Sequence, residues 1–575
     1  MPFPTQIGSR MTENSLIVTG RFLALATICA AGALSTSEGA SAQEPSGGHP
    51  IDNPAVIAEC SSCHRQDEEG RLSRISWLRK TPEGWQTSLA RMQALHGVAI
   101  DPIAARAVVR YLSDEQGLAP DELRPGLFEV ERRQVEYDYP GDSNVEYTCM
   151  VCHSMGRVIT QRRTREEWGL LLDTHRALYP LVDNQSFRLG TRSGDQEHPM
   201  DVAIRHLAEE FPLETPAWSA WSATKRPPRL AGEWVLSGYA PGKGPVYGTV
   251  SIAADARDPN AFATRATYVV AESGERIERT GQGLVYTGYQ WRGRSNPGQE
   301  SELREVMFVE RDAQTMSGRW FSGAYDEVGV DVTLRRAEAG GSVSGVYPAA
   351  LTRGETTTVT IFGAELESTI DALDFGEGVA LAGIENRGAT SARVRLAVAP
   401  TAMLGRRDLF SGRAVLEGAV VVHDGVDRIE VTPLAGLARV GGAAFPQGTQ
   451  TYDALGYDDG PDAEPNTDDD LALGRVAVTW RLEEYMSTSG DDDVRFVGTI
   501  RPDGTFEPSL DGPNPARSGN RNNIGDVWVV ATHQSSGGQE LSARAHLVVT
   551  VPLYMRFNPW AGPEDTRPPV GDRQQ

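Results

Sequence analysis

The sequence is poor in cysteine: its 575 residues contain 5. Cys29 lies in an N-terminal segment that we expect to be removed, and the other four form two pairs, Cys60/Cys63 and Cys149/Cys152. Because each pair belongs to a motif described below, no cysteine is left for a structural disulfide. A chain of this length must therefore depend on its hydrophobic cores for stability.

Basic charge and long apolar runs are also scarce. The chain has 55 Lys and Arg against 78 Asp and Glu, a net charge of −23. This balance argues against a nucleic-acid-binding protein, which would present a basic face. The apolar run Phe22–Leu34 is too short for a comfortable membrane span, and no later run is long enough. The sequence therefore predicts no membrane span and no nucleic-acid partner.

Familiar catalytic motifs are missing from the C-terminal part of the chain. There is no P-loop and no GxSxG, and Gly281-Gln282-Gly283 has no helix after it to make a dinucleotide site. The acidic runs 458–470 and 491–493 do not fit the ligand spacing of an EF-hand, so we interpret them as solvated loops. Residues 230–575 are therefore expected to act as a scaffold, with no catalytic residues.

Two CxxCH pentads are the most informative features present, at Cys60–His64 and Cys149–His153. This motif attaches c-type haem: the cysteines form thioethers with the vinyl groups, and the histidine becomes the proximal ligand of the iron. A CxxC pair alone could also be a redox dithiol or half of a zinc site. Because both copies end in histidine, the sequence predicts two covalently bound haem c groups.

The N-terminus resembles a secretory signal. Arg21 precedes the apolar run, and Ala40-Ser41-Ala42 is a small-x-small cleavage pattern. We predict a signal peptide over residues 1–42 and expect the mature protein to begin at Gln43. Translation from Met11 and an uncleaved anchor are the alternatives. Since thioether-linked haem is normally assembled outside the cytoplasm, the expected location is the periplasm.

The haem motifs lie in a duplicated helical region. Residues 80–96 align with residues 163–179 at a constant offset, which superposes Trp85 on Trp168, and residues 110–112 align with 205–207. Threonine followed by Glu before each Trp is a helix-start signal. The sequence therefore predicts a dihaem cytochrome c domain over 43–222, made of repeated units at about 50–125 and 140–218.

The repeat also suggests the second axial ligands. Met92 and His175 occupy equivalent positions, seven residues after the aligned Trp, and both residue types ligate haem iron. We predict His64/Met92 for the first haem and His153/His175 for the second. Methionine raises the reduction potential relative to histidine, so the two haems should differ in potential. His96, one turn beyond Met92, is the alternative ligand of the first haem.

Other His, Met and Trp residues are expected to have different roles. His198 and Met200 are further candidates for the distal ligand of a haem iron. Met155 lies too close to its own pentad to reach the distal side of that haem. His206 aligns with a tyrosine and is interpreted as a packing residue, as are Trp85 and Trp168.

Beyond a linker near 225–229, short β-rich runs separated by Gly turns replace the helical pattern. We predict a multidomain chain with an α-helical dihaem cytochrome c domain followed by three antiparallel β domains. These are a β-barrel or sandwich over 228–338, an immunoglobulin-like sandwich over 342–427 and a second immunoglobulin-like β-sandwich over 428–560, and residues 561–575 form an extended tail.

Taken together, the chain resembles the large dihaem α subunit of quinohemoprotein amine dehydrogenase. The resemblance rests on Cys60–His64, residues 80–97, Cys149–His153 and residues 161–175, with the domain order extending it over nearly the whole mature chain. It implies a periplasmic heterotrimer that oxidises primary amines to aldehyde and ammonia. The partners it implies are a small γ subunit bearing cysteine tryptophylquinone, a β-propeller β subunit and a soluble acceptor, azurin or a cytochrome c.

On this resemblance the chain carries electrons, and the amine is oxidised on another subunit, so we expect no catalytic residue here. Two alternatives stay open. A dihaem peroxidase would need one haem with an open or displaceable sixth position. A stand-alone dihaem electron carrier would use its β domains to dock on a partner.

Overall fold

The computed structural model describes most of the chain between residues 47 and 552. The described ranges are 47–126, 139, 141–150, 153–187, 197–322, 328–338, 341–412, 414–442, 444–486, 491–535 and 537–552. The expected signal peptide, Cys152 and the expected tail at 561–575 lie outside these ranges.

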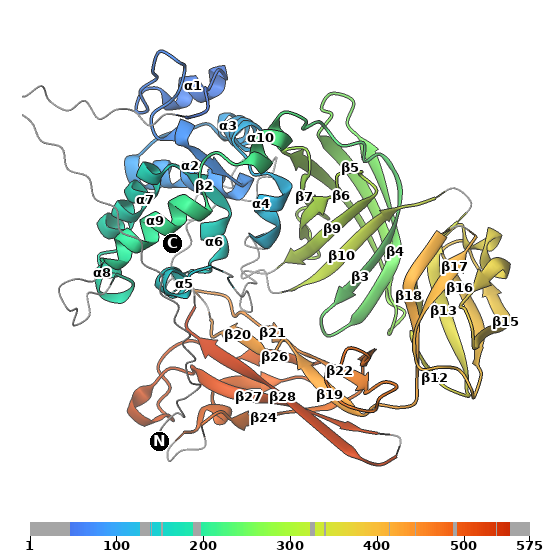
Figure 1. Cartoon of the computed structure of the whole chain (residues 1–575). Coiled ribbons are helices and arrows are strands. Elements are labelled where there is room, and N and C mark those ends of the chain that lie inside the picture. Colours follow the sequence, from blue (N-terminus) through green and yellow to red (C-terminus); the bar gives the residue numbers. More distant parts are fainter. Residues whose placement is uncertain are drawn as a thin grey trace, which may run out of the picture. The chain divides into compact units, whose positions relative to one another are not determined.

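The first helical unit contains the first pentad, and its helices α1, α2 and α3 are labelled in Figure 1. It consists of α1 (Pro54–Cys60), η1 (Ile75–Trp77), β1 (Leu78–Lys80), α2 (Pro82–His96) and α3 (Pro102–Glu115). The Thr81 hydroxyl accepts a hydrogen bond from the Gly84 amide, so the predicted helix start is confirmed. Buried side chains of α1, α2 and α3, including Val56, Trp85 and Val108, form one core. Met92 therefore lies on α2, a helix that is fixed by its Thr81 N-cap and by the packing of its buried face.

The second helical unit repeats this plan. It consists of α5 (Ser143–Met150), α6 (Gly156–Ile159), β2 (Gln161–Arg163), α7 (Arg165–Leu178), α8 (Val182–Gln185) and α9 (Pro199–Glu210). Thr164 caps α7 by accepting a hydrogen bond from the Glu167 amide, as Thr81 does for α2. Trp168 is fully buried in a core with Leu172 and Leu207. His175 therefore lies on the same turn of α7 as Met92 does on α2.

The two units share details that a repeat should share. The indole of Trp85 donates to the Gln116 carbonyl at 3.2 Å, and that of Trp168 donates to the Phe211 carbonyl at the same distance. Both acceptors are C-cap residues, which directly follow the closing helix α3 or α9. The units join through β1 and β2, which pair antiparallel with Lys80 opposite Gln161. Both tryptophans thus have the packing role that the repeat predicts.

Short helices complete the N-terminal region. They are α4 (Pro120–Leu123), η2 (Arg124–Gly126) and α10 (Pro216–Ser222). Pro begins α4 and α10, where its missing N–H costs nothing because no carbonyl precedes it in the helix. These segments place Glu122, which accepts a hydrogen bond from Thr215, between Arg79 of the first unit and Arg162 of the second.

The next part is a closed barrel of eight antiparallel strands, with β10 returning to pair with β3. The strands are β3 (Gly232–Ala240), β4 (Gly244–Ala254), β5 (Ala261–Val270), β6 (Arg276–Tyr286), β7 (Gln290–Ser295), β8 (Leu303–Val309), β9 (Thr315–Ser322) and β10 (Val328–Arg336). Alternate residues point inward and fill the interior, among them Trp234, Trp291 and Trp320. Of the predicted barrel or sandwich, the barrel is therefore the form found.

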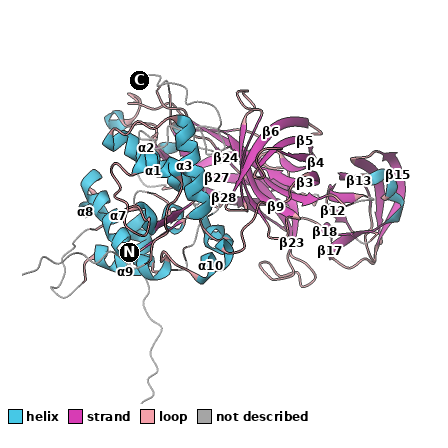
Figure 2. Cartoon of the chain, turned by 90° about the horizontal axis from the view of Figure 1, so that it is seen from above, coloured by secondary structure: helices cyan, strands magenta, loops and turns pink. Residues whose placement is uncertain are grey.

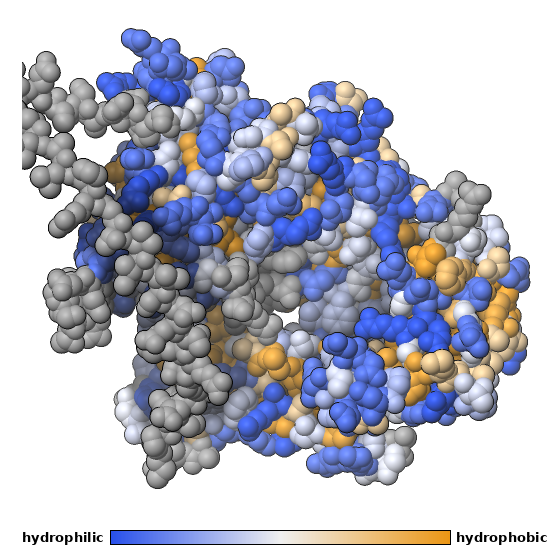
Figure 3. Space-filling view, in the orientation of Figure 1, coloured by the Kyte–Doolittle hydropathy of each residue, from blue (hydrophilic) through white to orange (hydrophobic). Residues whose placement is uncertain are grey.

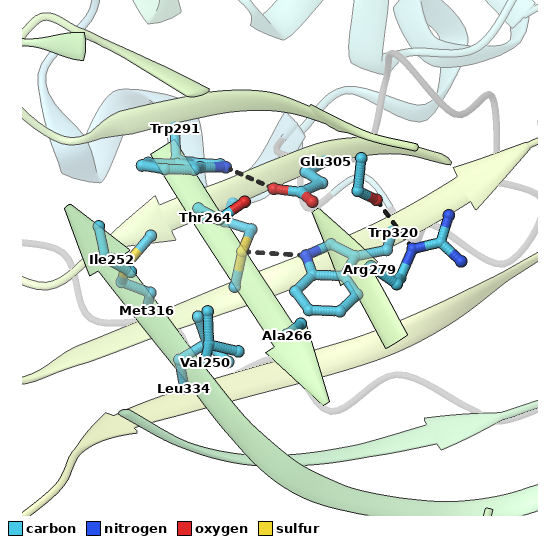
Figure 4. A pocket seen from close by; sticks show the side chains of 12 residues that line it. Val250, Ile252, Thr264, Ala266, Arg279, Trp291, Glu305, Met316, Trp320 and Leu334 are labelled. Carbon is cyan, nitrogen blue, oxygen red and sulfur yellow. Dashed lines mark hydrogen bonds between the residues drawn. The ribbon is translucent and has the colours of Figure 1, made fainter. Parts of the chain in front are cut away.

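The barrel interior leaves a cavity with room for roughly one water molecule (Figure 4). Polar groups in its wall are paired with neighbours. The Trp291 indole donates to the Glu305 carboxylate at 3.0 Å, and the Arg279 guanidinium donates to the Ser295 hydroxyl at 2.9 Å. The Trp320 indole points at the Met307 sulfur, 3.3 Å away. The interior is thus a packed core.

A β-sandwich of two four-stranded sheets follows. One sheet has the order β11 (Ser342–Tyr347), β13 (Thr356–Ala364), β16 (Ser391–Val398), β15 (Val379–Arg387). The other has the order β12 (Ala350–Thr352), β18 (Ala414–His423), β17 (Gly405–Ser411), β14 (Leu373–Asp374). Short 3-10 turns at Leu366–Ser368 and Ile370–Ala372 lead to β14. All these pairings are antiparallel except β12 with β18, which is parallel.

The last described part is built from three small sheets. They are β19 (Arg428–Thr432), β22 (Asp453–Asp458), β23 (Leu471–Arg475); then β20 (Ala435–Arg439), β28 (Glu540–Thr550), β27 (Gly525–Gln534), β24 (Thr479–Glu484); and β21 (Gln450–Thr451), β26 (Thr505–Pro508), β25 (Gly498–Ile500). Here too one edge strand, β20, pairs parallel, with β28. The core gathers Val527, Val529, Leu547 and their neighbours.

Helices and long strands occupy different parts of the chain, as the colouring in Figure 2 shows. The multidomain prediction, helical first and β afterwards, is confirmed for the described residues. On the face drawn in Figure 3, hydrophilic residues cover much of the described surface, with smaller hydrophobic areas between them. No helix among the described residues is long and apolar enough to cross a bilayer.

Polar contacts join the helical region to the barrel. Glu83, in the first turn of α2, receives two hydrogen bonds from the Arg292 guanidinium of β7, at 2.5 and 3.2 Å. The Tyr289 hydroxyl donates to the Leu118 carbonyl at 2.9 Å, and Arg110 of α3 pairs with Asp258. Arg292 is almost fully buried. The helix that carries Met92 is therefore fixed from its N-terminus by the barrel.

Candidate haem-binding sites

The first pentad begins at the end of α1. Cys60 is the last residue of this helix and is half-buried, whereas Cys63 is exposed. The His64 Nδ1 lies 2.8 Å from the Ser73 carbonyl oxygen. Because a carbonyl can only accept, Nδ1 must carry the proton, which leaves the lone pair on Nε2. A metal-ligating histidine has this arrangement, since the second hydrogen bond fixes its tautomer and orientation.

In the second unit the structure brings two histidines together. The ring centres of His153 and His175 are 6.4 Å apart, with an angle of 49° between the planes. With metal–nitrogen bonds of about 2.0–2.1 Å, two imidazoles on opposite sides of one ion have ring centres roughly 6 Å apart. The observed separation therefore suits a shared metal ion and is too long for direct stacking.

Both of these imidazoles have the tautomer that ligation requires. The His153 Nδ1 donates to the Ser154 carbonyl at 2.9 Å, and the His175 Nδ1 donates to the Leu171 carbonyl at 2.8 Å. In each ring Nε2 keeps its lone pair. Burial lowers the pKa of His153 and of His175 below the usual value, more than these hydrogen bonds raise it. Neutral imidazole is the form that binds a metal.

Two of the motif cysteines, Cys60 and Cys149, are poor thiolates. Burial raises the pKa of the Cys60 thiol to about 11 and that of the Cys149 thiol to about 12. A redox dithiol or a zinc site needs a thiolate, and proteins lower the thiol pKa to obtain one. Within the described ranges, moreover, no three or more His, Cys, Asp or Glu side chains are grouped to hold a metal ion. The donor set fits thioether-linked haem with axial imidazoles.

Met92 and His96, the two candidates for the first haem, differ in exposure. Met92 is half-buried on α2, while His96, in the last turn of the same helix, is exposed. Leu95 and its repeat counterpart Leu178, which lie three residues after Met92 and His175, are 48% and 38% exposed.

The remaining His and Met residues near the two sites have structural roles in the fold. The His198 ring caps α9 by accepting a hydrogen bond from the Met200 amide at 3.1 Å, and Met200 is buried. Met155 is also buried in the core of its unit. His206 lies 2.8 Å from the Tyr139 hydroxyl and packs against that ring, as expected for a packing residue.

A set of basic residues near the junction of the two units was not predicted from the sequence. At the offset of the repeat, Arg74, Arg79 and Lys80 align with Arg157, Arg162 and Arg163. The Arg79 guanidinium is fully buried and donates to both oxygens of Glu122 at 2.7 and 2.8 Å. Arg162 lies 3.3 Å from the same carboxylate. The sequence could have revealed these residues, because all three basic positions recur at the constant offset of the repeat.

Comparisons with solved structures find only remote likeness. They include a redesigned β-barrel (15% identity, covering 19% of this chain and 92% of that one, TM-score 0.17) and mouse clustered PcdhgC3 EC1-3 (10%, 43% and 77%, 0.16). They also include the SGBP-B protein of a Bacteroides ovatus mixed-linkage glucan utilization locus (8%, 55% and 60%, 0.17). TM-scores this low support no conclusion about this chain. No curated protein matches it.

The fold and the donor set together define a haem-binding protein with a helical N-terminal region and three β parts. Family models match in the same order. They describe the haem-binding part of the quinohemoprotein amine dehydrogenase α subunit (residues 52–218) and its domains II (227–337), III (341–424) and IV (429–560). The chain belongs to the family of quinohemoprotein amine dehydrogenase α subunits, and the predicted resemblance is confirmed.

Proposed function

We propose that this chain is the dihaem electron-transfer subunit of a periplasmic amine dehydrogenase. It would receive electrons from a cysteine tryptophylquinone in a small γ subunit as primary amines are oxidised to aldehyde and ammonia. It would pass them to azurin or a soluble cytochrome c, with a β-propeller subunit completing the complex. The family membership supports the class of reaction, and the cysteine usage supports a separate quinone subunit, because no cysteine here is spare.

The roles of individual residues follow from the two units. Cys60, Cys63, Cys149 and Cys152 would attach the haems, and His64 and His153 would bind iron on the proximal side. His175 would complete the second site and Met92 the first, with His96 as the alternative. Each bound haem would supply reversible one-electron chemistry. The protein holds the imidazole tautomers through the carbonyls of Ser73, Ser154 and Leu171.

The observation that carries this proposal is the pair His153/His175, with ring centres 6.4 Å apart and both Nδ1 atoms hydrogen-bonded. If both residues bound the iron of the second haem, they would leave it no open axial position, which weighs against peroxidase chemistry at that haem. Met92 on the first haem would give that site the higher potential. Two haems of different reduction potential would favour electron flow in one direction.

Purification of the native protein tests the proposal. We expect companion subunits to copurify, and addition of a primary amine under anaerobic conditions to produce the absorbance bands of reduced haem c. Isolation of the chain alone, or haems that stay oxidised in the presence of amines and reduce with dithionite, would contradict the dehydrogenase assignment. Reactivity of either haem with peroxide would favour the peroxidase alternative.

A further inference from the structure

The carbonyl that orients His64 has a second hydrogen-bond donor. The Ser73 oxygen accepts the His64 Nδ1–H at 2.8 Å and also the Ile75 amide at 2.9 Å. A bond from residue i+2 to residue i closes a γ-turn, here with Arg74 at its centre. The position of this carbonyl, and with it the orientation of the proximal imidazole, is therefore set by the backbone of Arg74.

The turn at Arg74 is strained. Its φ is 70° and its ψ is −49°, near the rare form of γ-turn with positive central φ, which L-residues with a Cβ seldom adopt. No glycine is used at this position. Strained backbone persists only where the surroundings hold it, and it concentrates at functional sites. Backbone hydrogen bonds from Ser73 to Arg65 and from Ser76 to Leu72 hold the chain on either side of the turn, and the side chain of Arg74 adds a contact from the second unit.

The Arg74 guanidinium crosses to the second haem unit. Its Nε lies 2.7 and 2.9 Å from the two oxygens of Glu167, which is buried in the first turn of α7. The Arg163 guanidinium is 3.8 Å from the same carboxylate. Eight residues after Glu167, about 12 Å along the helix, α7 carries His175. Arg74 therefore contacts segments that position proposed iron ligands in both haem sites.

We propose that Arg74 is a positioning residue that couples the two haem sites. Its backbone turn aims the Ser73 carbonyl at the proximal ligand of the first haem, and its guanidinium fixes the helix that carries the distal ligand of the second. A shift of α7 is transmitted through Glu167 and Arg74 to the hydrogen bond on His64. This inference rests on the proposed function, because it takes His64 and His175 to be axial ligands.

The repeat does not provide a second, equivalent link from the other unit. At the offset of the repeat, Glu167 corresponds to Gly84, which has no carboxylate, and Arg74 corresponds to Arg157, which is exposed on α6. The reciprocal ion pair therefore cannot form. A hydrogen bond to Nδ1 raises the basicity of an imidazole ligand, so a change in the Ser73 bond shifts the potential of the first haem.

The test compares two variants of the holoprotein that lose the same charge. Arg74→Met keeps a Cβ in the strained turn but loses the ion pair that holds it, so the turn should relax. Arg74→Gly loses the ion pair yet adopts the same turn without strain. The readouts are the paramagnetically shifted proton resonances of the axial histidines, the electron paramagnetic resonance signal of each haem and the two midpoint potentials.

We expect both variants to shift the signal of the second haem, and only Arg74→Met to shift the His64 resonances. The electron-exchange equilibrium between the haems should change at least threefold in Arg74→Met, about 28 mV for a one-electron difference. Arg74→Lys should restore most of the wild-type signals, which covers the case in which Arg74→Met folds poorly. Glu167→Gln, made in the second unit, should also shift the His64 resonances.

Arg71→Met is the matched control. Arg71 lies in the same loop and pairs with Asp67 at 2.7 Å and Glu69 at 3.1 Å, both within the first unit. Its loss should leave the signal of the second haem unchanged. The proposal is overturned if Arg74→Met and Arg74→Gly act alike on the first haem, or if neither changes the second. Wild-type spectra without two low-spin haems would instead overturn the proposed function, and the inference with it.

Discussion

Glu122→Gln should destabilise the helical region more than any surface substitution, because Glu122 balances two buried cations. Its carboxylate accepts two hydrogen bonds from Arg79, one from the Thr215 hydroxyl at 2.8 Å and one from the Ala119 amide at 2.8 Å. The side chains of Arg79 and Arg162 are 0% and 7% exposed. An amide keeps the shape of the carboxylate but leaves these guanidinium groups without their counter-charge.

The magnitude follows from that burial. Removing one partner of a buried ion pair costs about 3–5 kcal/mol. For a region of 150–250 residues, each kcal/mol lowers Tm by about 2–4 °C, so the transition should fall by about 6–20 °C. Thermal unfolding followed by the haem Soret band and near-ultraviolet circular dichroism measures this shift in the helical region.

The control for this prediction is Asp258→Asn. Asp258 and Arg110 form a pair whose side chains are 28% and 32% exposed, so its loss should cost at most about 1 kcal/mol. Equal Tm values for Glu122→Gln and Asp258→Asn, or a Glu122→Gln value within 2–4 °C of wild type (about 1 kcal/mol), would refute the reasoning about Glu122.

Further predictions concern pH, the barrel contact and the ligands. Burial alone would raise the pKa of Glu122, but hydrogen bonds and charge from Arg79 bring it below the usual value. The ionised carboxylate therefore stabilises the fold above its unfolded-state pKa, and this stabilisation is lost as pH falls through its folded-state pKa. The stabilities of wild type and Glu122→Gln should therefore converge in an acid titration. Arg292→Met should lower Tm by roughly 6–20 °C, because it leaves Glu83 unpaired against the barrel. His175→Met should raise the midpoint potential of the second haem in a redox titration, and an unchanged potential would remove His175 from the ligand set.

Local features of this chain are predictable from its sequence because they depend on neighbours in the chain. The CxxCH pentads, the Thr81 and Thr164 caps and the buried tryptophans all follow from short motifs and a constant repeat offset. The pairing of His153 with His175 was a prediction from the same repeat, and the structure places the two rings 6.4 Å apart. Whether they bind iron stays a prediction.

Long-range features were beyond the sequence. Alternating strands do not reveal whether β10 returns to β3, because closure depends on the register of all eight strands. Glu122 lies outside the aligned segments of the repeat, so the sequence did not mark it as the partner of Arg79 and Arg162. The turn at Arg74 has no glycine to mark it in the sequence, and its contact with Glu167 involves a residue 93 positions later in the chain.

An anaerobic titration of the purified complex with a primary amine tests the central claim most directly. The account predicts that the amine reduces two haems per copy of this chain, with the methionine-ligated haem reduced first and the bis-histidine haem second. Haems that remain oxidised with excess amine, or a single haem per chain, would contradict it.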